Sequence, residues 1–258
     1  MTLIDRIQAQ LHASARQNYA AVNAPPFIYY FNPDTALPWS NYAIPNQPVS
    51  SDLQEALAEL VTAFQARERL PRLEYIEEFA PLLTAELVHF GFTEEMRALL
   101  MVCTPTTYRV ATTPEGVEFR LIDWDESLPV IQAALTVQRR AFGEADAPET
   151  PLAEADQFRQ RFRTSQLFVA DYQGQIVSVA TLQPPHAGIT EIAGIATLPT
   201  VRRRGIATAL TAHAVAAAFA QGLDAVSLTA GSAEAGRVYT NAGFVTIGSG
   251  LAYSLPTQ

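Results

Sequence analysis

Apolar residues recur with two different periods in the C-terminal part of the chain. Between Glu126 and Phe142 they follow one another at roughly helical spacing, which predicts a helix, and residues 152–162 indicate a second helix. Residues 116–121 have the pattern of a strand. The sequence Tyr-Gln-Gly-Gln at residues 172–175 lies between two short apolar runs, which is typical of a β-hairpin. The expected hairpin strands are Leu167–Asp171 and Ile176–Leu182.

The last quarter of the chain continues this alternation of strands and helices. An apolar run at Ile189–Thr197 predicts a strand, and a helix is expected over Ile206–Ala220. The remaining expected elements are a strand at Ala225–Thr229, a short helix that includes Tyr239, and two closing strands near Val245–Ile247 and Leu251–Leu255.

The N-terminal half has the pattern of a smaller α/β domain. Residues 3–22 indicate a helix and Phe27–Phe31 a strand. Ser51 and Gln54 form a capping-box pattern that opens a helix containing Leu57, Leu60 and Phe64. After residues 73–75, a helix at about residues 77–90 that ends at Gly91 and a strand at Leu99–Cys103 complete this half. Thr and Pro concentrate at residues 104–115, so we expect domains over residues 1–112 and 113–258.

Composition narrows the class of protein. The chain has 258 residues, 48% of them apolar, which is enough to bury a substantial core. Its formal net charge of −9 argues against general attraction to nucleic acid or to an anionic membrane. All seventeen basic side chains counted as Lys or Arg are arginines, so a Walker-type nucleotide site with its lysine is excluded.

Cysteine and histidine usage excludes two further kinds of site. Cys103 is the single cysteine, so no internal disulfide is possible, and it lies in an apolar run typical of a core. The four histidines lack metal-ligand spacing, and we expect no metal site. No apolar run reaches about 18 residues, so we expect a soluble, cytoplasmic protein without a membrane or nucleic-acid partner.

A basic turn joins the strand at residues 189–197 to the helix that follows it. The sequence runs Arg202-Arg203-Arg204-Gly205-Ile206-Ala207-Thr208. The first N–H groups of a helix have no partner within the helix, and the helix dipole adds partial positive charge at that end. Gly205 and Ala207 allow a phosphate close to the main chain, and the three arginines supply countercharge. The turn is therefore a candidate diphosphate site, although an ordinary helix start with a basic first turn has the same pattern.

This turn resembles motif A of the GCN5-related N-acetyltransferase (GNAT) superfamily, Gln/Arg-x-x-Gly-x-Gly/Ala, in which consecutive amides hold the pyrophosphate of acetyl-coenzyme A. Arg202, Gly205 and Ala207 match its fixed positions, and Tyr239 stands four residues before Gly243-Phe244, as in the family's terminal pattern. The resemblance covers about residues 115–256. It implies a mixed, mostly antiparallel sheet flanked by helices, splayed where two central parallel strands part to admit the pantetheine arm.

The resemblance also implies catalytic and binding roles. Glu191 matches the strand glutamate that serves several family members as general base, and Tyr239 matches the tyrosine that protonates the departing thiolate. A carboxylate is a weak base for an ammonium group, so Glu191 would act through water or on an amine of lowered pKa. The amides of Ile195, Ala196 and Thr197 would contact the pantetheine arm and the thioester carbonyl, and residues 202–208 would bind the diphosphate. Core packing for Tyr239 and solvent exposure for Glu191 are the alternatives.

The implied activity is acetyl transfer from acetyl-coenzyme A to a primary amine within a ternary complex. The alternative is a regulatory module that binds acyl-coenzyme A without turnover. Residues 143–156 carry Glu144, Asp146, Glu149, Glu154 and Asp156, which would favour a cationic small-molecule or peptide amine, or would form only a solvated loop. Gly91-Phe92 before a strand echoes Gly243-Phe244, which suggests a degenerate GNAT-like N-terminal unit. That half lacks Arg-x-x-Gly-x-Ala, so we expect no coenzyme there.

Overall fold

The computed structural model describes residues 1–49, 52–143 and 145–256. By its internal contacts the chain forms two compact units. The first unit comprises Met1–Met101, Thr229–Ala233 and Thr246–Gln258, and the second unit comprises Val102–Leu228 and Glu234–Val245. The end of the chain thus belongs to the first unit, whereas the expected division into domains 1–112 and 113–258 stays a prediction.

The second unit is a sheet with helices on both faces. Its strands lie in the order β10-β9-β8-β7-β6, antiparallel from β6 to β9, whereas β9 and β10 are parallel. Its elements are β6 (Val117–Leu121), α4 (Leu128–Phe142), α5 (Leu152–Arg161), β7 (Gln166–Tyr172), β8 (Gln175–Leu182), β9 (Ile189–Thr197), the short 3-10 turn η2 (Pro199–Val201), α6 (Ile206–Ala220), β10 (Ala225–Ala230) and α7 (Ala233–Asn241).

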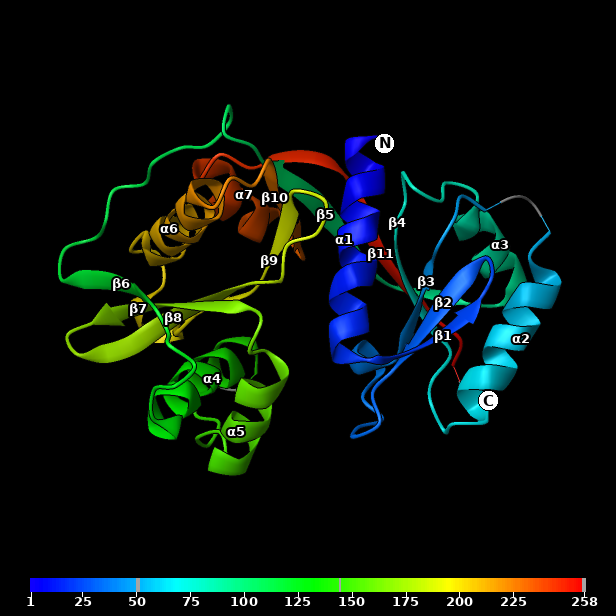
Figure 1. Cartoon of the computed structure of the whole chain (residues 1–258), viewed down its shortest axis with the longest axis horizontal. Helices are drawn as coiled ribbons and strands as arrows, with labels where there is room; N and C mark the ends of the chain where they lie inside the picture. Colours follow the sequence, from blue (N-terminus) through cyan, green and yellow to red (C-terminus); the bar gives the residue numbers. More distant parts are fainter. Residues whose placement is uncertain (50–51, 144, 257–258) are drawn as a thin grey trace. The chain divides into compact units, whose positions relative to one another are not determined.

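Strand alternation explains how these helices are held. Leu167 and Val169 of β7 share a buried apolar cluster with Ile131 of α4, whereas Phe168 between them contacts His213 of α6, with ring centroids 5.9 Å apart. Successive side chains of a strand point to opposite faces, so α4 and α6 cover opposite faces of the sheet. Figure 1 shows this arrangement, with α4 and α5 on one side of β7 and β8 and α6 on the other.

The first unit contributes the other strands of the single 11-stranded sheet and has its own core. The order of its strands is β1-β2-β3-β4-β11-β5, with β3 and β4 parallel. Its elements are α1 (Leu3–Asn18), β1 (Ala20–Ala24), β2 (Phe27–Phe31), the 3-10 turn η1 (Pro38–Ser40), β3 (Tyr42–Pro45), α2 (Gln54–Gln65), β4 (Arg72–Ile76), α3 (Leu83–Phe90), β5 (Thr93–Cys103) and β11 (Val245–Ser254).

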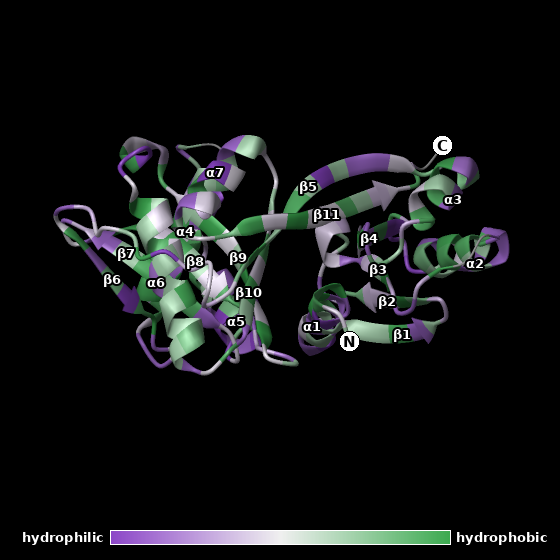
Figure 2. Cartoon of the chain, turned by 90° about the horizontal axis from the view of Figure 1, so that it is seen from above, coloured by the Kyte–Doolittle hydropathy of each residue, from purple (hydrophilic) through white to green (hydrophobic). Residues whose placement is uncertain are grey.

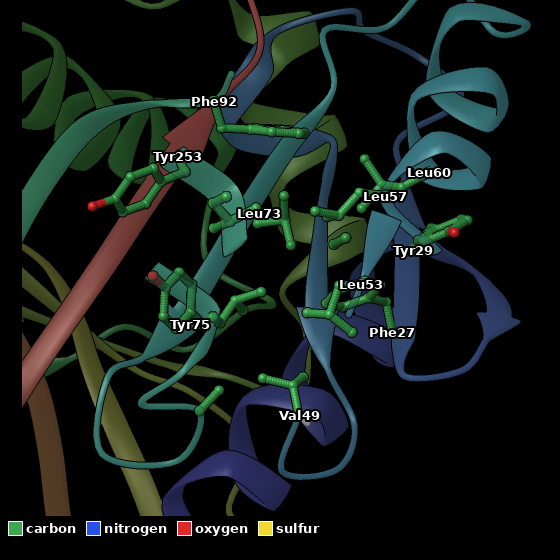
Figure 3. Packing of buried hydrophobic residues seen from close by; sticks show 14 of the residues in the cluster. Phe27, Tyr29, Val49, Leu53, Leu57, Leu60, Leu73, Tyr75, Phe92 and Tyr253 are labelled. Atoms are coloured by element: carbon green, nitrogen blue, oxygen red, sulfur yellow. The ribbon is translucent and has the colours of Figure 1, made fainter. Parts of the chain in front are cut away.

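The core of the first unit lies between this sheet and helices α2 and α3. Helix α2 carries both hydrophobic and hydrophilic residues (Figure 2), and its Leu57, Leu60 and Phe64 are fully buried. Tyr253 of β11 contributes to the same cluster as Leu73 of β4 (Figure 3). The strand that ends the chain therefore completes the N-terminal core.

The chain contains one series of elements twice. The series consists of three antiparallel strands, a helix, a strand parallel to the third, a second helix and a last strand. It occurs first as β1–β5 with α2 and α3, and again as β7–β11 with α6 and α7. The second helix ends alike in both, because the N–H of Phe92 bonds to the carbonyl of Leu87 (2.9 Å) and that of Phe244 to Tyr239 (3.1 Å). Leu87 thus occupies, in the first copy of the series, the position that Tyr239 has in the second, and the first copy has no hydroxyl at that position.

Four expected boundaries are wrong. Strand β5 begins at Thr93 instead of Leu99. Residues 20–22 belong to strand β1, because β1 pairs with β2 along its whole length and this pairing outweighs the helix propensity of its alanines. Helix α3 begins at Leu83 instead of residue 77, because Pro81 has no N–H to donate within a helix. The two closing strands are a single strand, β11. Helix α2 agrees with the prediction, but Ser51 of the expected capping box lies outside the described residues.

Two glycines explain why β11 does not break. A Cβ at Gly248 would meet the carboxylate of Glu78, and a Cβ at Gly250 would meet Thr229 at 2.9 Å. These glycines allow close approach of neighbouring groups, so they are not turn residues.

Candidate functional site

A cleft of about 530 Å³ opens in the second unit at the end of β9. It lies between the first turn of α6, one face of α7 and the C-terminal end of α4. Nearly all of the sequence-predicted binding residues line it, as does Tyr239. The lining residues are Ala141, Phe142, Ile195, Ala196, Thr197, Val201, Arg202, Arg203, Gly205, Ile206, Ala207, Thr208, Glu234, Ala235, Val238, Tyr239 and Asn241.

The N-terminus of α6 supplies unpartnered donors to this cleft. Gly205 is the N-cap residue, with φ 80°, and no side chain caps the helix. The first helical bond runs from the N–H of Ala209 to the carbonyl of Gly205 (3.0 Å), so the amides of Ile206, Ala207 and Thr208 precede the helical ladder. A 15-residue helix with an uncapped N-terminus in a cleft is a strong anion site.

The three arginines of the turn have three different positions. Arg202 donates to the carbonyl of Thr197 (3.0 Å) and to that of Ala141 (2.8 Å), so it ties the end of β9 to the end of α4. Arg204 lies outside the lining of the cleft, because its guanidinium lies over the ring of Tyr172, 5.6 Å from the centroid, and donates to the hydroxyl at 3.3 Å. Arg203 lines the cleft and makes no side-chain hydrogen bond or ion pair with the described residues. Arg203 is therefore the cation best placed to meet a bound anion.

Arg203 has a backbone conformation that side chains rarely adopt. Its φ is +62°, in the left-handed region, where a residue with a Cβ carries a cost of about 1–2 kcal/mol. Such strain persists where the surroundings enforce it, and it concentrates at functional sites.

Strand β9 is irregular where it borders the cleft. Val179 of β8 pairs with Ala196 and Thr181 pairs with Ala193, so Gly194 and Ile195 stand opposite a single residue of β8. This is a β-bulge, which re-aims the groups of the bulged strand. The bulge occupies the first position of the segment whose amides were expected to contact the thioester.

The sheet also parts beside this bulge. The parallel pairing of β9 and β10 joins Ile189–Glu191 to Ala225–Ser227, and among the described residues it does not continue into residues 192–197. The structure thus has the mixed, mostly antiparallel and splayed sheet that the resemblance implied. Glu191 lies at the last paired position, where the two strands separate.

Tyr239 lies on α7 and faces the cleft. Its ring packs against that of Phe244, with centroids 6.2 Å apart. Burial raises the pKa of the Tyr239 phenol, so its hydroxyl stays protonated and able to donate at neutral pH.

Glu191 is not among the residues that line the cleft. Its backbone carbonyl accepts the N–H of Gln183 (2.8 Å), and its side chain is half-buried. The structure therefore places Glu191 at the fork of the sheet, on the strand that carries Ile195, and leaves its role as a base a prediction.

The acidic segment at residues 143–156, whose last two carboxylates lie in α5, is partly neutralised. Glu154 pairs with Arg139 (2.6 Å) and Asp156 pairs with Arg159 (2.5 Å). Glu149 lines a separate cavity of about 630 Å³ beside α4. Glu144 lies outside the described residues.

Several cleft residues were not predicted from the sequence. Ala235 and Glu234 line the cleft from α7, and Phe142, a residue that is 70% exposed, lines it from the end of α4. Ala235 lies four residues before Tyr239, on the same helix face, which is a signal that the sequence did contain. No sequence pattern brings the end of α4 to this place. The others are Ala141, Val201, Val238 and Asn241.

The described residues contain no group of three or more His, Cys, Asp or Glu side chains arranged to hold a metal ion. None of the described helices combines the length and the apolar character needed to cross a bilayer.

Comparison with known proteins agrees with this geometry. Residues 131–244 match the sequence profile of the acetyltransferase (GNAT) family. No curated protein matches the sequence.

Solved structures extend the likeness to the whole chain. A GCN5-related N-acetyltransferase from Kribbella flavida is 24% identical, with a TM-score of 0.82 over 100% of this chain and 97% of the other. One from Sphaerobacter thermophilus is 17% identical, with a TM-score of 0.65 over 99% and 92%. A tandem GNAT protein from the clavulanic acid biosynthesis pathway is 11% identical, with a TM-score of 0.61 over 90% and 79%.

These matches extend over both copies of the repeated series, in agreement with the expectation of a GNAT-like N-terminal half. Residues 131–244 thus form an acetyltransferase domain of the GNAT family, in a chain whose whole fold is similar to those of GNAT proteins, a tandem one among them.

Proposed function

We propose that the protein transfers an acetyl group from acetyl-coenzyme A to a primary amine, by direct transfer in a ternary complex. The observation that carries the proposal is the uncapped N-terminus of α6 in the cleft, with Arg203 beside it and Tyr239 across from it. Bound there, acetyl-coenzyme A would supply an activated acetyl thioester.

The residues of the cleft fit the diphosphate of that substrate. The amides of Ile206, Ala207 and Thr208 offer donors without helical partners, and Gly205 at positive φ brings the chain into the turn without strain. Arg203 adds a charge. Arg202 supports this site indirectly, because its bonds to Thr197 and Ala141 hold the turn in place.

Three groups would serve the chemistry. The bulge at Gly194–Ile195 presents a main-chain amide for the thioester carbonyl, and one such donor contributes about 2.7–4 kcal/mol where it meets the developing oxyanion. Tyr239, kept protonated by burial, would give its proton to the departing thiolate. Glu191, at the fork of β9 and β10, would accept the proton of the amine through water.

Direct transfer is favoured over an acetyl-enzyme because the chain lacks a suitable thiol nucleophile. Cys103 is the only cysteine; it is fully buried, and burial raises its pKa. A thiol in that environment stays protonated and inert. Holding the amine and the thioester together then supplies most of the rate, about 7–11 kcal/mol in well-oriented systems.

The acceptor is a primary amine whose charge the acidic segment would select. Because arginines neutralise Glu154 and Asp156, a preference for a cationic amine would depend chiefly on Asp146 and Glu149. Equal turnover of neutral and cationic amines of similar size would exclude that preference.

The test is an amine library assayed for release of free coenzyme A thiol. Acetyl-coenzyme A without amine is the control for hydrolysis. The expected result is amine-dependent thiol release, with initial-rate lines that intersect when both substrates are varied. Tight binding of acetyl-coenzyme A without thiol release to any amine would instead indicate the non-catalytic acyl-coenzyme A-binding module.

A further inference from the structure

One polar residue interrupts the buried stripe of α4. Ile131, Ala134 and Leu135 are buried against the sheet, and Gln138 follows them at helical spacing. Its side chain is half-buried, and its Nε2 donates to the carbonyl oxygen of Gly194 at 3.0 Å. This glutamine lies in an apolar stripe and supplies a hydrogen-bond donor to the bulge of the neighbouring strand, which a leucine could not do.

Gly194 is shaped for this contact. Its φ is +62°, which strongly favours glycine, and a Cβ at this position would stand 2.5 Å from Nε2 of Gln138. The absence of a side chain therefore leaves the space that the glutamine amide occupies. Both partners of the bond are thus adapted to each other.

The bond fixes the direction of a neighbouring donor. The carbonyl of Gly194 and the N–H of Ile195 belong to one planar peptide unit, and in a trans peptide they point in opposite directions. The cis peptide bond in the described residues is Pro25–Pro26, so this unit is trans. With its oxygen held by Gln138, the unit aims the Ile195 N–H away from the Gln138 amide. Ile195 is also the first residue of β9 that lines the cleft.

We propose that Gln138 is a positioning residue, which holds the Gly194–Ile195 peptide so that the Ile195 N–H meets the thioester carbonyl. This inference rests on the proposed function, since it assigns an orienting group to the carbonyl-binding amide of the same site. Gln138 acts on the peptide and makes no contact with the substrate itself.

The test measures the carbonyl of bound acetyl-coenzyme A directly and needs no acceptor. Isotope-edited infrared spectra of [1-¹³C]acetyl-coenzyme A are recorded free and bound to the wild type, to Gln138→Met and to Gln138→Glu. Methionine keeps the volume without a donor, and glutamate keeps the shape without a donor at neutral pH. Gln132→Met is the matched control, because Gln132 lies on the same helix and donates to the carbonyl of Thr150 (2.8 Å), away from the cleft.

The expected result is a lowered carbonyl stretching frequency in the wild-type and Gln132→Met complexes, which returns toward the free value in both Gln138 variants. The dissociation constant of coenzyme A should stay within about twofold in all four proteins, and kcat with any amine found should fall about 10- to 100-fold only in the Gln138 variants. A purely structural role would lower the stability of the two Gln138 variants and leave the frequency of the bound carbonyl as it is in the wild type.

Two outcomes overturn the inference while the proposed function stands. One is a carbonyl shift that persists in Gln138→Met, and the other is a wild-type complex without any shift. Failure of wild-type protein to bind acetyl-coenzyme A would instead overturn the proposed function.

Discussion

Replacing Arg203 with glycine should change stability and coenzyme affinity in opposite directions. The left-handed backbone of Arg203 costs about 1–2 kcal/mol for a residue with a Cβ, and glycine avoids this cost. Glycine also loses more chain entropy on folding, about 0.5–1 kcal/mol. The net expectation for Arg203→Gly is a free energy of unfolding that is unchanged or raised by up to about 1.5 kcal/mol.

The same substitution should weaken coenzyme A binding. A cation about 4 Å from a phosphate gains about 1 kcal/mol in water and about 4 kcal/mol at an effective dielectric constant of 20. Arg203 is exposed, so a value of about 1–2 kcal/mol applies, which is about a five- to thirtyfold increase in the dissociation constant. The loss should shrink as salt is added, because exposed charges are screened.

Calorimetric titration with coenzyme A and denaturant unfolding together test this reasoning. Arg204→Ala is the matched control, because its guanidinium already stacks on Tyr172 outside the cleft, and it should change the affinity less than about twofold. The reasoning is refuted if Arg203→Gly binds as well as the wild type, or if Arg204→Ala loses as much affinity as Arg203→Gly does.

Three further predictions concern catalysis and stability. Tyr239→Phe should lower kcat by about 10²-fold or more without changing coenzyme A affinity, and full turnover by this variant would remove the acid role. Because burial raises the Tyr239 pKa, wild-type activity should persist above the pH at which a free phenol ionises. Glu191→Gln should lower kcat/KM most at neutral pH, where the amine is protonated, and an unchanged pH profile would exclude Glu191 as the base. Burial raises the pKa values of Tyr29 and Tyr30 to about 12, so the folded state holds these protons more tightly than the unfolded state. The free energy of unfolding should therefore be constant below pH 10 and fall by up to about 3 kcal/mol per tyrosine as the pH rises from 10 to 12. Equal free energies of urea unfolding at pH 9 and pH 11 would contradict this.

The elements nearest the site could be read from the sequence because local signals are strong there. Helix α6 has the predicted bounds, and the turn at Gln173-Gly174 has both residues at positive φ, as a tight hairpin requires. Strand β1 could not be predicted, because its pairing with β2, and not its own composition, decides its conformation. The single strand β11 was missed for a similar reason: its glycines serve contacts with Glu78 and Thr229 that are distant in sequence.

Within the site, the position of the basic turn could be predicted from the sequence, but the role of each of its side chains could not. The sequence alone does not distinguish the three arginines at positions 202–204. Only in the folded chain does Ala141 come within hydrogen-bond distance of Arg202, and Tyr172 within hydrogen-bond distance of Arg204. The bulge in β9 depends on register with β8, which no local pattern specifies. The residues of the site could thus be predicted from the sequence, whereas their separate roles depend on long-range contacts.

The measurement that tests the central claim most directly is a crystal structure of the protein with coenzyme A. The account predicts diphosphate oxygens about 2.7–3.2 Å from the main-chain nitrogens of Ile206, Ala207 and Thr208, with Arg203 beside them. A diphosphate bound elsewhere, or nitrogens at this turn that contact protein groups in the complex, would contradict it.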